Sequence, residues 1–245
     1  KNPANHGYQN YKGIPQLRKS IASFYKSVYG VNLDPETMVL PLMGSKEGIM
    51  HITMAFVNEG EEVLIPNPGY PTYSSVATLV GAKLRPYALR EASNWGIDIE
   101  ALRKSDLSKV KLMWVNFPHM PTGRTASANE LKELVDLARE NQFLIVNDNP
   151  YSLILNDEPI SLLSVEGANE VALELNSLSK SHNMAGWRIG WVAGRKEYID
   201  SVLKVKSNMD SGMFLGLQHA AVEALSSGEK WFKNLNELYS ARKKI

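Results

Sequence analysis

Short apolar runs alternate with helical segments along most of this chain, and this alternation limits the possible folds more than any other feature. Strand-like runs occupy residues 38–42, 62–65, 83–87, 110–115, 143–146, 171–175 and 189–192. Helical spacing of apolar residues predicts helices over 14–29, 46–57, 73–80, 99–104, 128–141 and from about 197 to the end. Such alternation predicts an α/β fold, a three-layer sandwich in which helices flank a mostly parallel central sheet.

Composition and charge exclude several classes of protein. Lys plus Arg number 27 and Asp plus Glu 26, a balance that gives no support to a nucleic-acid or membrane partner. The absence of cysteine excludes disulfides and thiolate metal sites, and the five histidines lack metal-ligand spacing, so no metal is expected. Neither a membrane-spanning run nor a signal peptide is evident, and a cytoplasmic location is expected.

One lysine lies in a cluster of small and hydroxyl residues just after the run 171–175. Lys180 follows Ser177 and Ser179, and Arg188 comes eight residues later. Small neighbours leave room for a ligand, and a lysine held there can lose its proton by desolvation and attack a carbonyl. A solvated lysine on a loop is the simpler interpretation of any single lysine.

Other polar residues also follow predicted strands, where parallel sheets bind ligands. Gly44, Ser45 and Lys46 come after the run 38–42 and open a helix, which suits an anion cradle or an ordinary capped turn. Asp148 follows the run 143–146, where a lone aspartate is most simply a helix cap or an ion-pair partner. Tyr70 lies in a loop stiffened by three prolines.

Taken in order, these motifs resemble those of the class I/II pyridoxal-phosphate-dependent aminotransferases of fold type I. Through this resemblance, Lys180 forms a Schiff base with the cofactor aldehyde and then acts as general base and acid. Asp148 faces the pyridine nitrogen, Tyr70 stacks on the ring, and Tyr151 bonds the ring oxygen. The loop sequences 44–48 and 67–73 look most like the diaminopimelate, aspartate and alanine aminotransferase branch.

The same resemblance assigns a set of ligands to the cofactor phosphate. These are Gly44, Ser45, Lys46, Ser177 and Arg188. A guanidinium fork suits a phosphate dianion better than an ammonium does.

The sequence departs from the family pattern at one position of the site. The family has Asn-Pro-Thr-Gly where this chain has Met120 followed by Pro-Thr-Gly. A thioether cannot donate a hydrogen bond to the ring oxygen. Tyr151, His119 and Asn116 are the candidates to replace that donor, and Asn116 is taken as a cofactor-binding residue.

The resemblance also divides the chain. Residues 1–13 read as a loop at a dimer interface, where Tyr8 matches a tyrosine that reaches the partner's phosphate. Residues 14–228 form the large cofactor domain, and 229–245 begin a helix leading to a small domain outside this sequence. Both ends look cut, so the chain is expected to bind pyridoxal phosphate but to transaminate poorly by itself.

The implied function is transfer of an amino group between an L-amino acid and a 2-oxo acid by a homodimeric enzyme of amino acid metabolism. Two alternatives stay open at this point. One is a pyridoxal-phosphate-dependent carbon–sulfur lyase, which shares the lysine, aspartate and arginine. The other is a non-catalytic, ligand-sensing aminotransferase-like domain of a transcription regulator.

Overall fold

The computed structural model describes residues 3–245, and these contain a seven-stranded sheet of order β1-β7-β6-β5-β4-β2-β3. The strands are β1 (Val39–Leu42), β2 (Glu62–Asn67), β3 (Lys83–Ala88), β4 (Val110–Val115), β5 (Leu144–Asp148), β6 (Ala172–Ser177) and β7 (Gly190–Gly194). Five neighbouring strands, in the order β6-β5-β4-β2-β3, pair in parallel. Strand β7 runs antiparallel to both of its neighbours, β6 and β1. The predicted mostly parallel sheet is confirmed.

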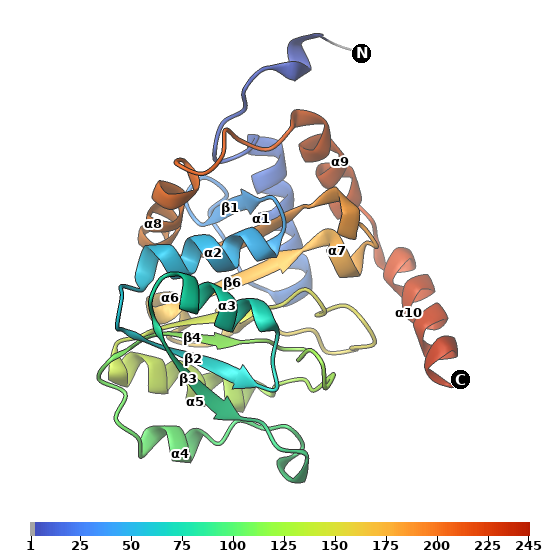
Figure 1. Ribbon diagram of the computed structural model, residues 1–245. Coiled ribbons are helices and arrows are strands. Elements are labelled where there is room, and N and C mark those ends of the chain that lie inside the picture. Colours follow the sequence, from blue (N-terminus) through green and yellow to red (C-terminus); the bar gives the residue numbers. More distant parts are fainter. Residues whose placement is uncertain (1–2) are drawn as a thin grey trace.

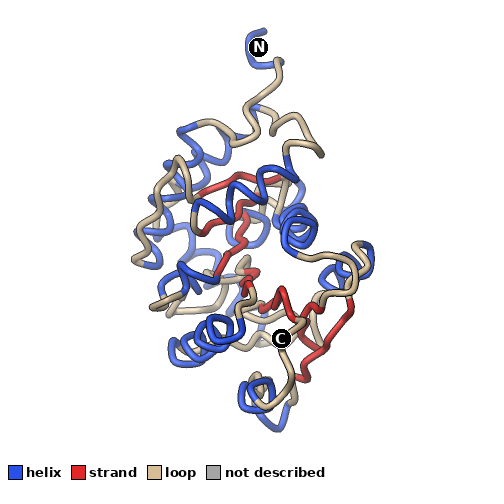
Figure 2. The backbone as a smooth tube through the Cα atoms, turned by 90° about the vertical axis from the view of Figure 1, so that its left-hand side faces the viewer, coloured by secondary structure: helices blue, strands red, loops and turns tan. Residues whose placement is uncertain are grey.

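Helices cover both faces of this sheet, and the strands lie between them in Figure 2. The α-helices are α1 (Pro15–Tyr29), α2 (Ser45–Phe56), α3 (Pro71–Leu79), α4 (Ile99–Arg103), α5 (Ala128–Asn141), α6 (Ala168–Val171), α7 (Leu178–Ser181), α8 (Lys196–Lys206), α9 (Leu215–Leu225) and α10 (Glu229–Lys243). Single 3-10 turns are η1 (Pro3–His6), η2 (Glu91–Ser93), η3 (Leu162–Ser164) and η4 (Ala185–Trp187).

The hydrophobic core forms two layers because successive strand residues point to opposite faces of the sheet. Side chains of α2, α3 and α8 pack on one face, and α2 and α3 lie in front of the sheet in Figure 1. The other face packs against α4 and α5 at one end of the sheet and against α1 and α9 at the other. The predicted three-layer sandwich is therefore confirmed.

Local sequence explains the best-defined elements. Helix α5 begins after Ser127, whose hydroxyl accepts a hydrogen bond from the Glu130 amide, and it buries Leu131, Leu134 and Val135 on one stripe. Strand β3 is the exposed sheet edge and carries charged residues and a proline, which discourage pairing with another chain.

Two predictions about the ends of the chain need correction. The C-terminal region is not one continuous helical stretch, because residues 207–214 separate α8 from α9 around Gly212, which has a positive φ of 87°. The predicted N-terminal loop contains η1, while residues 1–2 lie outside the described part of the chain. Figure 1 shows this N-terminal arm and α10 projecting from the body in different directions.

The strand ends that are followed by the predicted site residues all lie on the same side of the sheet, which is called the carboxyl edge here. The carboxyl ends of β1, β2, β4, β5 and β6 share this edge with the amino end of β7. At the edge, Gly190 of β7 pairs with Leu42 of β1 on one side and with Ser177 of β6 on the other. The segment after β1 thereby lies close to the segment after β6.

Candidate active site

A cavity of about 470 Å³ opens at this edge of the sheet. Every residue predicted for the site lines it except Gly44 and Tyr8. The lining consists of Ser45, Lys46, Tyr70, Tyr73, Asn116, Met120, Asp148, Pro150, Tyr151, Ser177, Ser179, Lys180, Ala185 and Arg188. Loops after five strands and the loop before β7 all contribute, as the strand-end argument predicts.

Polar groups able to bind an anion meet at one end of the cavity. Gly44, with a φ of 85°, precedes the first turn of α2 and provides no side-chain cap, so the first amides of the helix have no side-chain acceptor. A Cβ built on Gly190 would lie 2.6 Å from the Ser45 amide nitrogen, so only glycine allows this close approach. The buried Ser177 hydroxyl has no hydrogen-bond partner within the part of the chain that the structure describes.

The guanidinium of Arg188 lies against the same turn. A Cβ on Gly44 would collide with Arg188 Nη2, so the Arg188 side chain lies directly over this glycine. Arg188 has a positive φ of 52° and donates from Nη1 to the Ala185 carbonyl at 2.6 Å. Although Gly44 does not line the cavity, its contact with Arg188 places it in the predicted anion cradle.

Asp148 is a buried carboxylate at the end of β5, on the strand itself rather than after it. Its Oδ2 accepts a hydrogen bond of 3.0 Å from the Tyr73 hydroxyl, whereas its buried Oδ1 has no partner among residues 3–245. Burial raises the pKa of Asp148 to about 6, although the hydrogen bond from Tyr73 acts in the opposite direction. The free oxygen suits a cationic N–H donor that enters the cavity.

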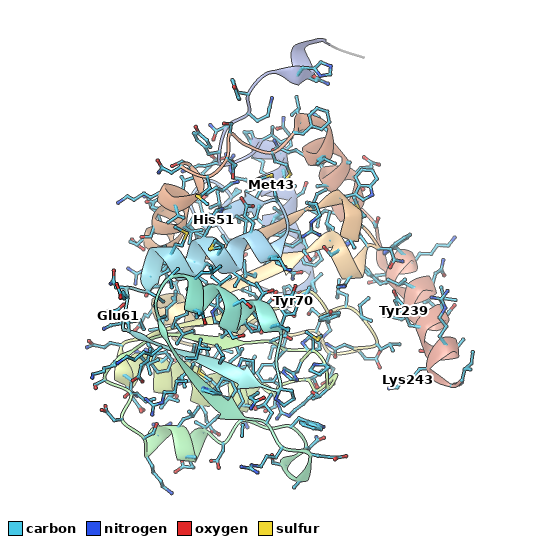
Figure 3. All side chains as sticks on the ribbon, in the orientation of Figure 1. Met43, His51, Glu61, Tyr70, Tyr239 and Lys243 are labelled. Atoms are coloured by element: carbon cyan, nitrogen blue, oxygen red, sulfur yellow. The ribbon has the colours of Figure 1, made fainter. Side chains whose placement is uncertain are left out.

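Two tyrosines form an aromatic wall beside this carboxylate. Tyr70, labelled in Figure 3 just before α3, meets the Tyr73 ring edge to face at 5.7 Å. The Tyr73 ring in turn stacks on Trp114 of β4 at 5.1 Å. Tyr73 therefore packs on the sheet and also donates a hydrogen bond to Asp148.

Lys180 and Tyr151 face each other across the cavity. Lys180 Nζ lies 5.7 Å from the centre of the Tyr151 ring. Burial, with the nearby charges of Asp148 and Tyr70, raises the pKa of the Tyr151 phenol. Lys180 is exposed, so the residues around the cavity do not desolvate its amine as the sequence predicts.

Asn116 links the loop after β4 to the end of β5 through two hydrogen bonds. Its Oδ1 accepts from the Met120 amide at 2.8 Å, and its Nδ2 donates to the Asp148 carbonyl at 2.5 Å. His119 Nδ1 lies 2.9 Å from the Thr122 hydroxyl, within its own loop. These hydrogen bonds engage the side chains of Asn116 and His119. Of the three candidates to replace the missing donor at Met120, Tyr151 is the one whose side chain they leave out.

Tyr8 is not brought to this cavity. Its side chain is 93% exposed and borders a separate hollow with Gln9, Gly212 and Phe214. Its predicted contact requires a second copy of the chain. Sequence reasoning missed Pro150 and Ala185, for which only their closeness to Asp148 and Arg188 gave a signal.

The family can be tested by comparison with known proteins. A family profile described as "Aminotransferase class I and II" matches residues 1–244. This chain belongs to the class I and II aminotransferases.

Curated relatives in this aminotransferase family are similar over the whole chain. The LL-diaminopimelate aminotransferase of Halothermothrix orenii is 41% identical over 247 residues, and that of Aquifex aeolicus is 42% identical over 246. Both alignments cover 100% of this chain and 64% of the relative. The chain thus spans less than two thirds of the length of these relatives.

Solved structures show the same fold. Substrate-bound BacF from Bacillus subtilis superposes with a TM-score of 0.94 at 39% identity, covering 98% of this chain and 62% of that one. A probable N-succinyldiaminopimelate aminotransferase from Thermus thermophilus gives a TM-score of 0.93 at 32% identity, covering 98% of this chain and 65% of that one. The architecture is that of fold type I aminotransferases.

Aminotransferases of this class depend on pyridoxal phosphate, and the residues of this cavity fit that group. The cradle of Gly44, Ser45 and Arg188 matches a phosphate, and the unpaired Ser177 hydroxyl offers a further donor. The unpaired Oδ1 of Asp148 matches a protonated ring nitrogen.

None of the helices within residues 3–245 has the length and apolar character needed to span a membrane.

Proposed function

We propose that this chain is the cofactor-binding part of an aminotransferase that moves an amino group between an L-amino acid and a 2-oxo acid. The observation that carries the proposal is the meeting of Lys180, Asp148 and Arg188 in one cavity, although Asp148 and Arg188 are 40 positions apart along the chain. The curated relatives named above are aminotransferases, which favours this reaction over the lyase and the sensor.

The side chains divide the work between binding and proton transfer. Arg188, Ser45 and Ser177 hold the phosphate, and Tyr70 supports the ring. When bound, pyridoxal phosphate supplies an aldehyde for the amino group and a ring that withdraws electrons from the substrate carbon. The Asp148 carboxylate keeps the ring nitrogen protonated through its free Oδ1.

Lys180 would hold the cofactor through its aldehyde group, and its amine would then move the substrate proton. Its amine removes the proton from the α-carbon and returns a proton as the reaction proceeds. Tyr151 lies opposite Lys180. Its hydroxyl would donate a hydrogen bond to the ring oxygen of the cofactor. With Met120 in place of an asparagine, this phenol carries the contact that two side chains share in the family pattern.

The assembly belongs to the proposal as well. The exposed Tyr8 on the projecting N-terminal arm supports a homodimer in which residues 1–13 lie at the interface. The body from residue 14 to 228 carries the cavity, and α10 within 229–245 leads toward a small domain. A cytoplasmic location agrees with the cysteine-free sequence.

The named relatives support one substrate class as the first to test. LL-Diaminopimelate is the first amino donor to test, because relatives about 40% identical to this chain carry that name. A panel of amino donors and 2-oxo acids should include aspartate and alanine, and should include cystathionine to detect lyase activity through released pyruvate.

Covalent capture of the cofactor tests the proposal directly. Reduction with borohydride in the presence of pyridoxal phosphate should add one cofactor to the peptide that contains residue 180, as measured by mass spectrometry. Lys180→Ala should abolish the label and the visible absorbance, whereas Lys196→Ala, which changes an exposed lysine on α8, should retain both. Equal labelling of the Lys180→Ala protein would refute the assignment.

A further inference from the structure

A buried charged cluster lies against the start of α2, next to the anion cradle. Glu47 Oε2 accepts a hydrogen bond from the backbone amide of Met43, the residue that precedes Gly44. Glu47 Oε1 lies 2.9 Å from His51 Nε2 and 3.4 Å from Lys206 Nζ. Figure 3 labels Met43, just before α2, and His51, on α2.

Lys206 completes the cluster from the far side. It is the last residue of α8 and also pairs with Asp210, whose Oδ1 accepts from the Gly212 amide at 2.7 Å. The Lys206 side chain is only 1% exposed, and a buried ammonium is retained only where carboxylates compensate it. The cluster therefore ties the start of α2 to the end of α8.

The carboxylate of Glu47 stays ionised in this setting. Burial alone would raise its pKa, but the hydrogen bond from His51 and the charge of Lys206 outweigh burial and lower the pKa to about 2. Glu47, His51 and Asp210 could in principle hold a metal ion, since their donor atoms lie within 4.8 Å of one another. The Lys206 ammonium already contacts both carboxylates, so the cluster is an ion-pair network that has its own cation.

This network acts on the cradle through one backbone group. Gly44 has no side chain to cap α2, and its own amide donates back to the Leu42 carbonyl at 2.8 Å. The Met43 amide, one residue earlier, is therefore the point at which a side chain fixes the turn. Since Ser45 follows within two residues, a shift at Met43 moves the first amides of α2 relative to Arg188.

We infer that Glu47 is a positioning residue for the phosphate group: held by His51 and Lys206, it fixes the Met43 amide and with it the Gly44–Ser45 turn. The inference rests on the proposed function, because it assumes that the cradle receives the phosphate of pyridoxal phosphate. Glu47 does not line the cavity and so acts through the backbone rather than by contact.

The test compares two ligands that differ only in the phosphate. Dissociation constants for pyridoxal 5'-phosphate and for pyridoxal are measured by absorbance for the wild type, Glu47→Gln and Glu62→Gln. Glu62 is a matched control, because it is a partly buried glutamate that pairs with Arg85. It lies at the amino end of β2, whereas the cavity lies at the carboxyl ends of the strands. Glu47→Gln should weaken pyridoxal phosphate binding roughly tenfold, the effect of losing a charge-assisted hydrogen bond, and leave pyridoxal binding within about twofold.

The outcomes separate the inference from the proposed function. If the wild type binds neither ligand, the proposed function fails. If the wild type binds both but Glu47→Gln weakens both equally, or neither, the inference alone is overturned. Should Glu47→Gln not fold, Lys206→Gln is measured in the same way, since it leaves the carboxylate in place but removes its cation. A selective loss of phosphate-dependent affinity supports the inference, and an equal loss for both ligands contradicts it.

Discussion

Replacing Asp148 by asparagine should stabilise the ligand-free protein at neutral pH. Burial raises the pKa of Asp148 from 3.8 to about 6, so ionising it costs the folded protein about 3 kcal/mol more than the unfolded chain, at 1.36 kcal/mol per pH unit. Below about pH 3 the carboxyl is protonated in both states and this cost is absent. As the pH rises through 6, the wild type loses that stability, whereas Asp148→Asn does not.

Urea unfolding of both proteins between about pH 3 and about pH 8 measures the effect. The free energy of unfolding of Asp148→Asn, relative to the wild type, should rise by about 3 kcal/mol across this range, because all other titrating groups are common to both. Saturating pyridoxal phosphate should reverse the order, since the wild-type carboxylate then pairs with the ring nitrogen. Parallel pH profiles in the absence of ligand would show that Asp148 carries no such cost, and the reasoning would be wrong.

Three further changes test other parts of the site and its support. Tyr73→Phe should raise the pKa of Asp148 further, by up to about one pH unit, because the hydrogen bond from Tyr73 lowers it; an NMR titration of the carboxyl checks this. Gly190→Ala should weaken pyridoxal phosphate binding more than tenfold, since the added Cβ would lie 2.6 Å from the Ser45 amide nitrogen; unchanged affinity in an absorbance titration would refute the close approach. Glu174→Ala should lower the free energy of unfolding by at least about 3 kcal/mol, because the buried carboxylate accepts three hydrogen bonds; urea unfolding that shifts by less than about 1 kcal/mol would contradict it.

The sequence predicts the sheet well because its inner strands are almost fully buried. The runs that became β4, β5 and β6 are apolar along most of their length, so they are found with errors of one or two residues. Strand direction is harder to predict. The connection from β6 to β7 holds only α7 and η4, which are four and three residues long, and not the longer helix that a parallel crossover usually contains.

The site was predictable where residues directly follow strands, and less so where tertiary contacts decide their role. Lys180 and Asp148 follow or end strands, and both line the cavity. Tyr73 lies on a helix, where an aromatic residue most simply packs in the core, and its hydrogen bond crosses 75 positions of sequence. The role of Glu47 depends on Lys206, which is 159 positions away, and no local pattern indicates such a pairing.

The pairing of Gly190 with both Leu42 and Ser177 has a consequence for how this protein tolerates insertions. A one-residue slip of β7 would bring Ile189 or Trp191 opposite the Ser45 turn and send each β7 side chain to the wrong face. Loop-length changes between residues 178 and 189 would therefore erase anion recognition by misaligning three strands at once, even if every ligand-contacting residue were kept. The strand alignment is as much a part of the phosphate site as any side chain that touches it.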